Sequence, residues 1–176
     1  MISWNDVFYF SIFSAALLLS VLGLGSTAIV PGIDRWNKRF FLSYFAVILL
    51  CCVAGLFDVL LSYSLGPGTV YFGVLFLECV ILSLPLLMLT VYLLHCCEEN
   101  VRQSRLLHAA LGLWAVYLAL LTSSLFIDGL TYVTPENTYA RGPLYPVFLL
   151  PLILILLLNL AGTIKRKDRL SRKVYN

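Results

Sequence analysis

Two acidic residues, Asp58 and Glu78, stand inside long apolar stretches of the sequence. On membrane-insertion scales, an ionised carboxylate at the centre of a bilayer costs at least about 2.5–3.5 kcal/mol. Such a group must therefore be protonated, reach water in a cavity, or have a partner. The functional interpretation is a site for a proton, a cation or a cationic ligand. The structural interpretation is a neutral acid that hydrogen-bonds across two adjacent helices and holds the fold.

A second polar group lies in the segment 128–146. Thr131–Val133 and Thr138–Ala140 favour strands, and the residues Pro135-Glu136-Asn137 favour a turn between them. We therefore expect a small β-hairpin over the outer mouth of the protein.

This hairpin has two interpretations. If it binds a ligand, the rings of Tyr132 and Tyr139 and the guanidinium of Arg141 would hold an anionic or polar headgroup. If it is a structural lid, an ion pair between Arg141 and Asp128 would hold it closed. The candidate ligand-binding residues are therefore Asp58, Glu78, Asp128, Tyr132, Tyr139 and Arg141.

The segment His95-Cys96-Cys97-Glu98-Glu99 is the only stretch of metal-binding residue types. Adjacent cysteines with one histidine lack the spaced second ligand pair of a zinc site, so free thiols or a lipidation site are the simpler interpretations. The sequence has no Gly-rich phosphate loop, no Ser/His/Asp arrangement and no kinase motif. We expect no catalytic residue, no metal and no cofactor.

Four further polar residues lie near span ends. His108 and Asn159 are expected to form hydrogen bonds between helices. Ser123 and Ser124 are expected to bond to carbonyl groups of their own helix.

The elements that position these residues follow from composition. The 176 residues are 61% hydrophobic and 12% charged, with a mean hydropathy of +0.94, whereas soluble domains are about 45–50% apolar and about 25% charged. A soluble domain of this length could not bury so much apolar surface. A compact cytosolic enzyme, a disordered tail and a nucleic-acid-binding protein are excluded.

Five apolar stretches are long enough to cross a bilayer as helices, which takes about 20 residues. We predict an all-α polytopic bundle over residues 1–164, followed by a basic cytoplasmic tail over 165–176. The predicted spans are Phe8–Val30, Phe40–Leu65, Thr69–Leu94, Leu106–Ile127 and Leu144–Ile164.

The cations indicate the orientation of these spans. Eleven of the twelve Lys and Arg residues lie in the first loop, the third loop and the tail, and Arg141 alone lies on the other side. Cytoplasmic loops carry the excess of positive charge. The N-terminus is therefore predicted outside and the C-terminus inside.

Four stretches together resemble a known family, and they are 31–41, 92–98, 132–135 with 139–146, and 170–173. They are similar to the N-terminal membrane region of bacterial sensor histidine kinases of gut Firmicutes, and to membrane regions that precede diguanylate cyclase domains. The most specific part is Tyr139-Ala140-Arg141-Gly142-Pro143, an aromatic residue and then Arg-Gly-Pro at the entry to a helix.

The resemblance implies a signal-sensing input module of the bacterial plasma membrane. Regions of this kind usually have seven spans and a cytoplasmic output domain, whereas five spans are present here. The family's phosphoacceptor and nucleotide-binding residues would lie beyond Asn176, so no enzymatic residue is carried over. The expected partners are the lipid bilayer, an unidentified extracellular or membrane ligand and, because sensor kinases work as dimers, a second copy of the chain.

Two other functions stay open at this stage. The first is a small transporter or channel subunit that couples to protons or cations through Asp58 and Glu78. The second is a structural membrane subunit in which these acids only hold helices together.

Overall fold

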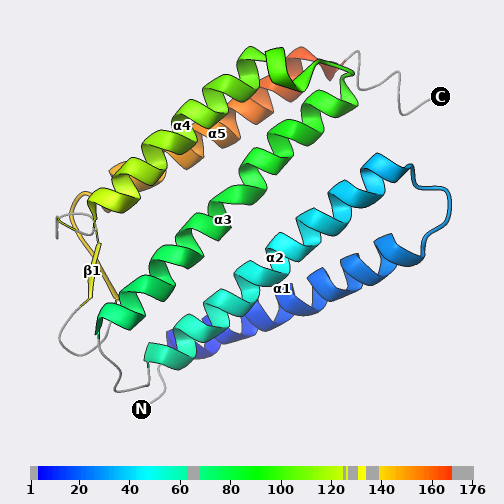
Figure 1. The fold of residues 1–176 in the computed structure, drawn as a ribbon. Coiled ribbons are helices and arrows are strands. Elements are labelled where there is room, and N and C mark those ends of the chain that lie inside the picture. The colour runs from blue at the N-terminus through cyan, green and yellow to red at the C-terminus, as the bar shows by residue number, and fades with distance from the viewer. Residues whose placement is uncertain (1–3, 63–67, 125, 127–130, 134–138, 168–176) are drawn as a thin grey trace. The chain divides into compact units, whose positions relative to one another are not determined.

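The computed structural model describes residues 4–62, 68–124, 126, 131–133 and 139–167 (Figure 1). The described elements are α1 (Trp4–Ile29), α2 (Arg35–Ser62), α3 (Gly68–Cys96), the short 3₁₀ helix η1 (Val101–Gln103), α4 (Arg105–Ser123), β1 (Thr131–Val133), β2 (Tyr139–Arg141) and α5 (Tyr145–Lys165). The two three-residue strands pair with each other.

In the described part of the chain, five helices are long and apolar enough to cross a membrane. Each of the five predicted spans overlaps one of them, so the prediction of a multi-pass, predominantly helical membrane protein is confirmed. The exposed positions of these helices carry many large apolar side chains, such as Leu19, Leu22 and Leu160. Their exposure is expected where lipid is the solvent.

Helix α2 begins at Arg35, five residues before the predicted span. Asp34 is the reason, because its carboxylate accepts a hydrogen bond from the backbone N–H of Asn37. This bond caps the first turn of the helix. Hydropathy locates only the apolar part of a helix, so the polar first turn was not included in the predicted span.

Helix α4 ends at Ser123, before the predicted end of its span at Ile127, which lies outside the described residues. The Oγ atoms of Ser123 and Ser124 donate to the carbonyls of Leu120 and Leu121, each at 2.7 Å. These bonds confirm the expected contacts of the two serines with their own helix. Side-chain bonds of this kind offer the backbone an alternative to the helical ladder, which favours an end here.

The contacts of the chain gather in two compact units. The first contains residues 1–85 and 133–139, and the second contains 86–132 and 140–176. Helix α3 passes from the first to the second between Pro85 and Leu86. The single bundle over 1–164 stays a prediction.

In the first unit, α1 and α2 lie side by side (Figure 1). Gly23 of α1 faces the ring of Phe45, and Gly55 of α2 faces the ring of Phe13. A Cβ atom at either glycine would lie less than 3.0 Å from the ring. Each helix therefore accepts an aromatic ring from the other at a position where it has no side chain.

The connection between α1 and α2 is stabilised by polar contacts. The Lys38 ammonium donates to the carbonyl oxygen of Ala28 at 2.7 Å, near the C-terminal end of α1. A cation is favoured there by the helix dipole. Gly32 has a φ angle of 90° in this turn, a conformation that favours glycine.

In the second unit, α4 and α5 lie side by side (Figure 1). Tyr117 of α4 and Phe148 of α5 are almost completely buried, and their ring centroids are 4.9 Å apart. Gly162 of α5 lies close to Leu93 and Leu106, because a Cβ atom there would be 3.1 Å from a methyl carbon of each leucine. The small residue lets α5 approach α3 and α4.

Candidate functional site

Of the two acids predicted inside spans, Glu78 is the one whose side chain the structure describes. It lies in α3 and is half-buried. It is close enough to the Cys51 thiol of α2 for an electrostatic interaction. Asp58 is placed by its backbone in α2, four residues before the helix ends. A site shared by the two acids stays a prediction.

The other predicted ligand-binding residues belong to the segment 128–146, which is predicted to lie outside the membrane. Asp128 lies outside the described residues, as do 134–138 with the predicted turn. Tyr132 is placed by its backbone in β1, and Tyr139 and Arg141 in β2. The ligand-binding and lid interpretations of this segment both stay predictions.

The described residues contain a polar site elsewhere, at the C-terminal end of α3. The helix ends in a turn in which Glu98 has a φ angle of 58°. The backbone N–H of Glu98 donates to the carbonyl of His95, and that of Glu99 to the carbonyl of Leu94. This pair of bonds defines a Schellman motif, whose left-handed position is usually glycine. Glu98 occupies it here.

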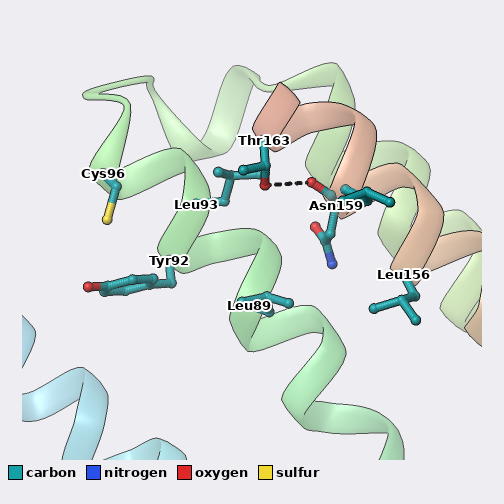
Figure 2. Close-up of a pocket in the computed structure, with 8 residues that line it drawn as sticks. Leu89, Tyr92, Leu93, Cys96, Leu156, Asn159 and Thr163 are labelled. Carbon is teal, nitrogen blue, oxygen red and sulfur yellow. Dashed lines mark hydrogen bonds between the residues drawn. The ribbon is translucent and has the colours of Figure 1, made fainter. Parts of the chain in front are cut away.

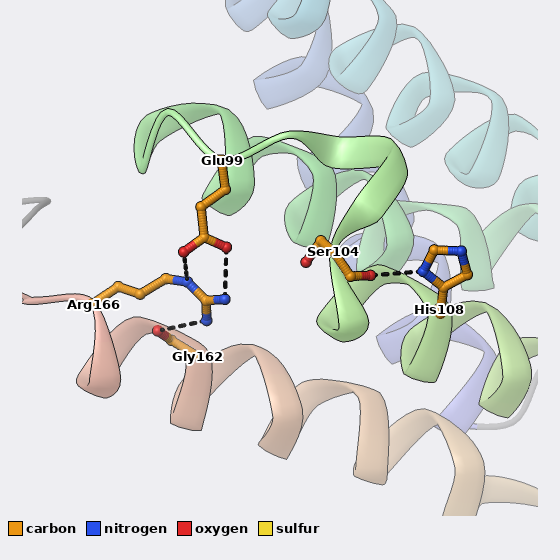
Figure 3. Close-up of polar contacts among 5 residues, drawn as sticks. All are labelled: Glu99, Ser104, His108, Gly162 and Arg166. Atoms are coloured by element: carbon orange, nitrogen blue, oxygen red, sulfur yellow. Dashed lines mark hydrogen bonds and ion pairs between the residues drawn. The ribbon is translucent and has the colours of Figure 1, made fainter.

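The Schellman turn positions Glu99 for a bidentate ion pair with Arg166 at the end of α5 (Figure 3). Arg166 Nε donates to Glu99 Oε1 at 2.9 Å, and Arg166 Nη2 donates to Glu99 Oε2 at 2.8 Å. The side chains are 26% and 17% exposed for Glu99 and Arg166 respectively. Two parallel bonds between planar groups fix direction as well as distance, so the pair connects the end of α3 to the last turn of α5.

The protonation of Arg166 reflects this contact. The hydrogen bond to Glu99 raises the pKa of the Arg166 guanidinium above its usual value, and burial opposes this effect only in part. Arg166 is therefore charged at every physiological pH, so titration of the arginine does not break the pair in that range.

Beside this pair, the loop from α3 to α4 is held by local bonds. Asn100 caps η1 by accepting from the backbone N–H of Arg102. His108 Nδ1 lies 2.8 Å from the carbonyl oxygen of Ser104, the residue that precedes α4 (Figure 3). The bond expected between His108 and another helix is thus replaced by one at the start of its own helix, four residues away.

Asn159 of α5 behaves as predicted. Its amide Nδ2 donates to the carbonyl oxygen of Leu86 in α3 at 3.2 Å, which confirms the expected bond between helices. The side chain is 3% exposed, and its oxygen Oδ1 accepts no hydrogen bond from any described residue. Figure 2 shows the side chain directed from α5 toward α3, at a groove between these helices.

The five cysteines are all free thiols, and Cys51, Cys52 and Cys97 are buried. Within the described ranges, no three His, Cys, Asp or Glu side chains gather closely enough to hold a metal ion. The site at the end of α3 is therefore one of charge pairing and hydrogen bonding.

Sequence reasoning did not identify the Glu99–Arg166 pair. The two residues are 67 positions apart, and Arg166 is one of six cations that follow Ile164. A partial signal exists, because Glu99 lies in a predicted cytoplasmic loop and the tail carries the opposite charge. Opposite charge indicates that Glu99 lies near the tail, but it does not indicate which of the six cations pairs with it.

Comparisons with models of protein families, with curated proteins and with solved structures find no match for the chain. The resemblance to sensor kinases therefore stays a prediction.

Proposed function

We propose that the chain is the non-catalytic sensing module of a bacterial protein similar to a sensor histidine kinase. In this proposal it lies in the plasma membrane with its N-terminus outside. Five membrane-length helices and the concentration of cations in the first loop, the third loop and the tail support the location and the orientation.

One observation carries the proposal furthest, the bidentate pair between Glu99 and Arg166. A sensing module must deliver a change in helix packing to the end from which the signal leaves the membrane. Arg166 directly follows α5 at the start of the basic tail, and Glu99 follows α3. A movement of α5 along α3 must therefore carry or break two charged hydrogen bonds, so the pair favours two discrete arrangements over a continuous slide.

The proposed input lies at the outer side. Asp58 and Glu78 would respond to a proton, a cation or a cationic ligand, and Tyr132, Tyr139 and Arg141, with Asp128, to an anionic or polar headgroup. A ligand can shift the module only by binding its two arrangements with different affinities. The two groups are therefore tested separately, with Glu78→Gln for the first and Arg141→Ala for the second.

The output end is tested by joining the whole chain in frame to the catalytic region of a histidine kinase and measuring autophosphorylation in membrane vesicles. We expect Glu99→Gln and Arg166→Gln to change the basal rate in the same direction, because each breaks the same pair. The double variant should have no further effect. Lys167→Gln is the matched control, since it removes one cation from the adjacent exposed position.

An unchanged rate in both single variants, with protein amounts equal to wild type, would contradict the proposal. A separate assay addresses transport. Proton-driven flux in proteoliposomes that is lost in Glu78→Gln would favour a proton-coupled transporter instead.

A further inference from the structure

The groove between the C-terminal half of α3 and the C-terminal half of α5 has the features of a binding site (Figure 2). Its volume is about 260 Å³. An apolar cavity of about 150 Å³ is large enough to bind benzene. The groove can therefore hold a larger organic molecule.

The shape of the groove follows from the helix period. Leu89 and Leu93 line it from α3, and Leu156, Leu160 and Thr163 line it from α5. On each helix the lining positions extend over two turns, so the groove is about 10 Å long at a rise of about 1.5 Å per residue. With carbon–carbon bonds of about 1.5 Å, a straight chain of about eight carbons has a similar length.

This groove differs from a purely apolar groove on a lipid-facing surface because one buried polar atom belongs to a residue that lines it. Asn159 lines it and is 3% exposed, and its Oδ1 atom has no donor among the described residues. The identity of this atom is fixed by its neighbour. The other end of the amide donates to the Leu86 carbonyl, and an oxygen placed there would face another oxygen. The unpaired atom is therefore an acceptor, and it requires a donor.

The side chains that line the groove do not supply that donor: Tyr92, Cys96 and Thr163 carry O–H or S–H groups, and Oδ1 has no hydrogen-bond partner in the described part of the chain. Thr163 Oγ1 donates its proton to the backbone carbonyl of Asn159 at 2.8 Å. A water molecule could donate to Oδ1, but its share of volume is about 30 Å³, and it would leave most of the apolar groove unfilled. A hydrocarbon chain would fill the groove and leave the oxygen unpaired.

We propose that the groove binds an uncharged molecule with a straight apolar body and one terminal hydroxyl group, which donates to Asn159 Oδ1. The apolar body lies along the leucines, and the oxygen of the ligand hydroxyl faces the Thr163 end of the groove. The hydroxyl reaches the buried amide only if Leu156 or Leu160 changes rotamer, and these side chains are 51% and 56% exposed, so such a change would not disturb the core. This site goes beyond the sensing function proposed above, and its test does not depend on that function.

The test uses the full chain in lipid nanodiscs and two photoreactive probes that differ in one group. The first is a diazirine derivative of octanol, and the second is the corresponding diazirine derivative of octane. Mass spectrometry measures labelling of the segments 89–96 and 156–163. We expect the alcohol to label both segments about tenfold more efficiently than the alkane, because one additional hydrogen bond is formed, and unlabelled octanol should compete.

Two variants separate the hydrogen bond from the shape of the groove. Asn159→Leu should abolish the preference for the alcohol, and Leu156→Phe should reduce labelling by both probes because the larger ring occupies the groove. Leu157→Phe is the matched control, since Leu157 is 52% exposed on the same helix and does not line the groove. Equal labelling by both probes in the wild-type protein would overturn the proposal and identify the groove as a site for lipid chains. A preference for the alcohol that persists in Asn159→Leu would also overturn it.

Discussion

The α1–α2 pair and the contact of α5 with the end of α3 are stabilised by different means. In the first, glycines at 23 and 55 accept the rings of Phe45 and Phe13, so the helices fit by shape. In the second, a bidentate ion pair and an amide–carbonyl hydrogen bond connect the helices. Lipid supplies no hydrophobic force between apolar helices, so close packing and polar bonds are the interactions available to hold them together. Close packing is the main interaction between α1 and α2, and polar bonds are the main interaction between α5 and α3.

The difference has a consequence for sensitivity to mutation. Close packing against a glycine is disrupted when a substitution adds atoms. An ion pair or a hydrogen bond is lost when a substitution removes a polar group or its charge. We therefore expect added atoms to destabilise the α1–α2 pair most, and the loss of polar groups to act at the end of α3 and along α5.

Adding one methyl group should disrupt the α1–α2 pair. Gly23→Ala should lower the free energy of unfolding in detergent micelles by about 1–3 kcal/mol, because the new Cβ overlaps the Phe45 ring. Gly25→Ala is the control on the same helix, since a Cβ there meets no atom within 4 Å. Equal stability of the two variants would show that α1 and α2 are not held by this contact.

Discharging the Glu99–Arg166 pair should destabilise the second region. Arg166→Gln is expected to lower the free energy of unfolding by about 1–2 kcal/mol, since both side chains are partly shielded from water and a charged bond is lost. A double-mutant cycle with Glu99→Gln measures the coupling between the two residues. A coupling energy near zero would contradict the claim that the ion pair between Glu99 and Arg166 stabilises the fold. The Lys167→Gln variant should stay within the error of the wild type.

The pH dependence of this pair follows from the raised pKa of Arg166. The folded-state pKa lies above the value in the unfolded chain, so the contribution of the arginine charge is complete at neutral and moderately alkaline pH. It is lost only when the pH rises through the higher folded-state pKa. The coupling measured with the double-mutant cycle should therefore be the same at neutral and at moderately alkaline pH.

Relieving the backbone at Glu98 should stabilise the protein. A residue with a side chain costs about 1–2 kcal/mol in the left-handed conformation, so Glu98→Gly should raise the free energy of unfolding by about 1 kcal/mol. Glu98→Ala removes the same charge and retains the strain, so it should give no gain. A gain in Glu98→Ala equal to that in Glu98→Gly would assign the effect to charge instead of conformation.

Removing the Asn159 bond should have the smallest effect. Hydrogen bonds between membrane helices contribute about 0.6 kcal/mol on average, and Leu86 O also accepts from the Thr90 hydroxyl. Asn159→Leu also removes the buried, unpaired acceptor Oδ1, which is unfavourable in the folded protein, and this gain offsets part of the stability lost with the hydrogen bond. Thermal unfolding of Asn159→Leu should therefore be close to that of the wild type, and a large loss of stability would indicate further contacts of the amide.

Much of the secondary structure could be predicted, since a stretch of about 20 apolar residues in lipid has few alternatives to a helix. The ends were predicted less well. Asp34 moves the start of α2 outward and Ser123 moves the end of α4 inward, because both act through hydrogen bonds that hydropathy does not measure. Asn159 was predicted as a link between helices because an amide in lipid needs a partner.

The candidate site was predicted only in part. Sequence reasoning selected scarce polar residues in the half of the chain's spans and loops that is predicted to be outer, and of these the structure describes the side chain of Glu78. It could not select Glu99 and Arg166, because a pairing across 67 positions depends on the turn after α3 and the length of α5. It also could not predict the ring-accepting glycines, because a glycine in a span shows nothing about which residue will face it.

Apolar length and composition were enough to predict a multi-pass membrane protein, because they leave lipid as the solvent of these segments. Which of the few polar and small residues meet depends on the folded structure. There Glu99 pairs with Arg166, Asn159 donates to the Leu86 carbonyl, and the Phe45 ring packs against Gly23. The two kinds of information differ in the distance over which the underlying interactions act. Burial in lipid is a property of each segment and can be read along the chain, whereas hydrogen bonds and steric fit act over a few ångströms and depend on how the helices pack.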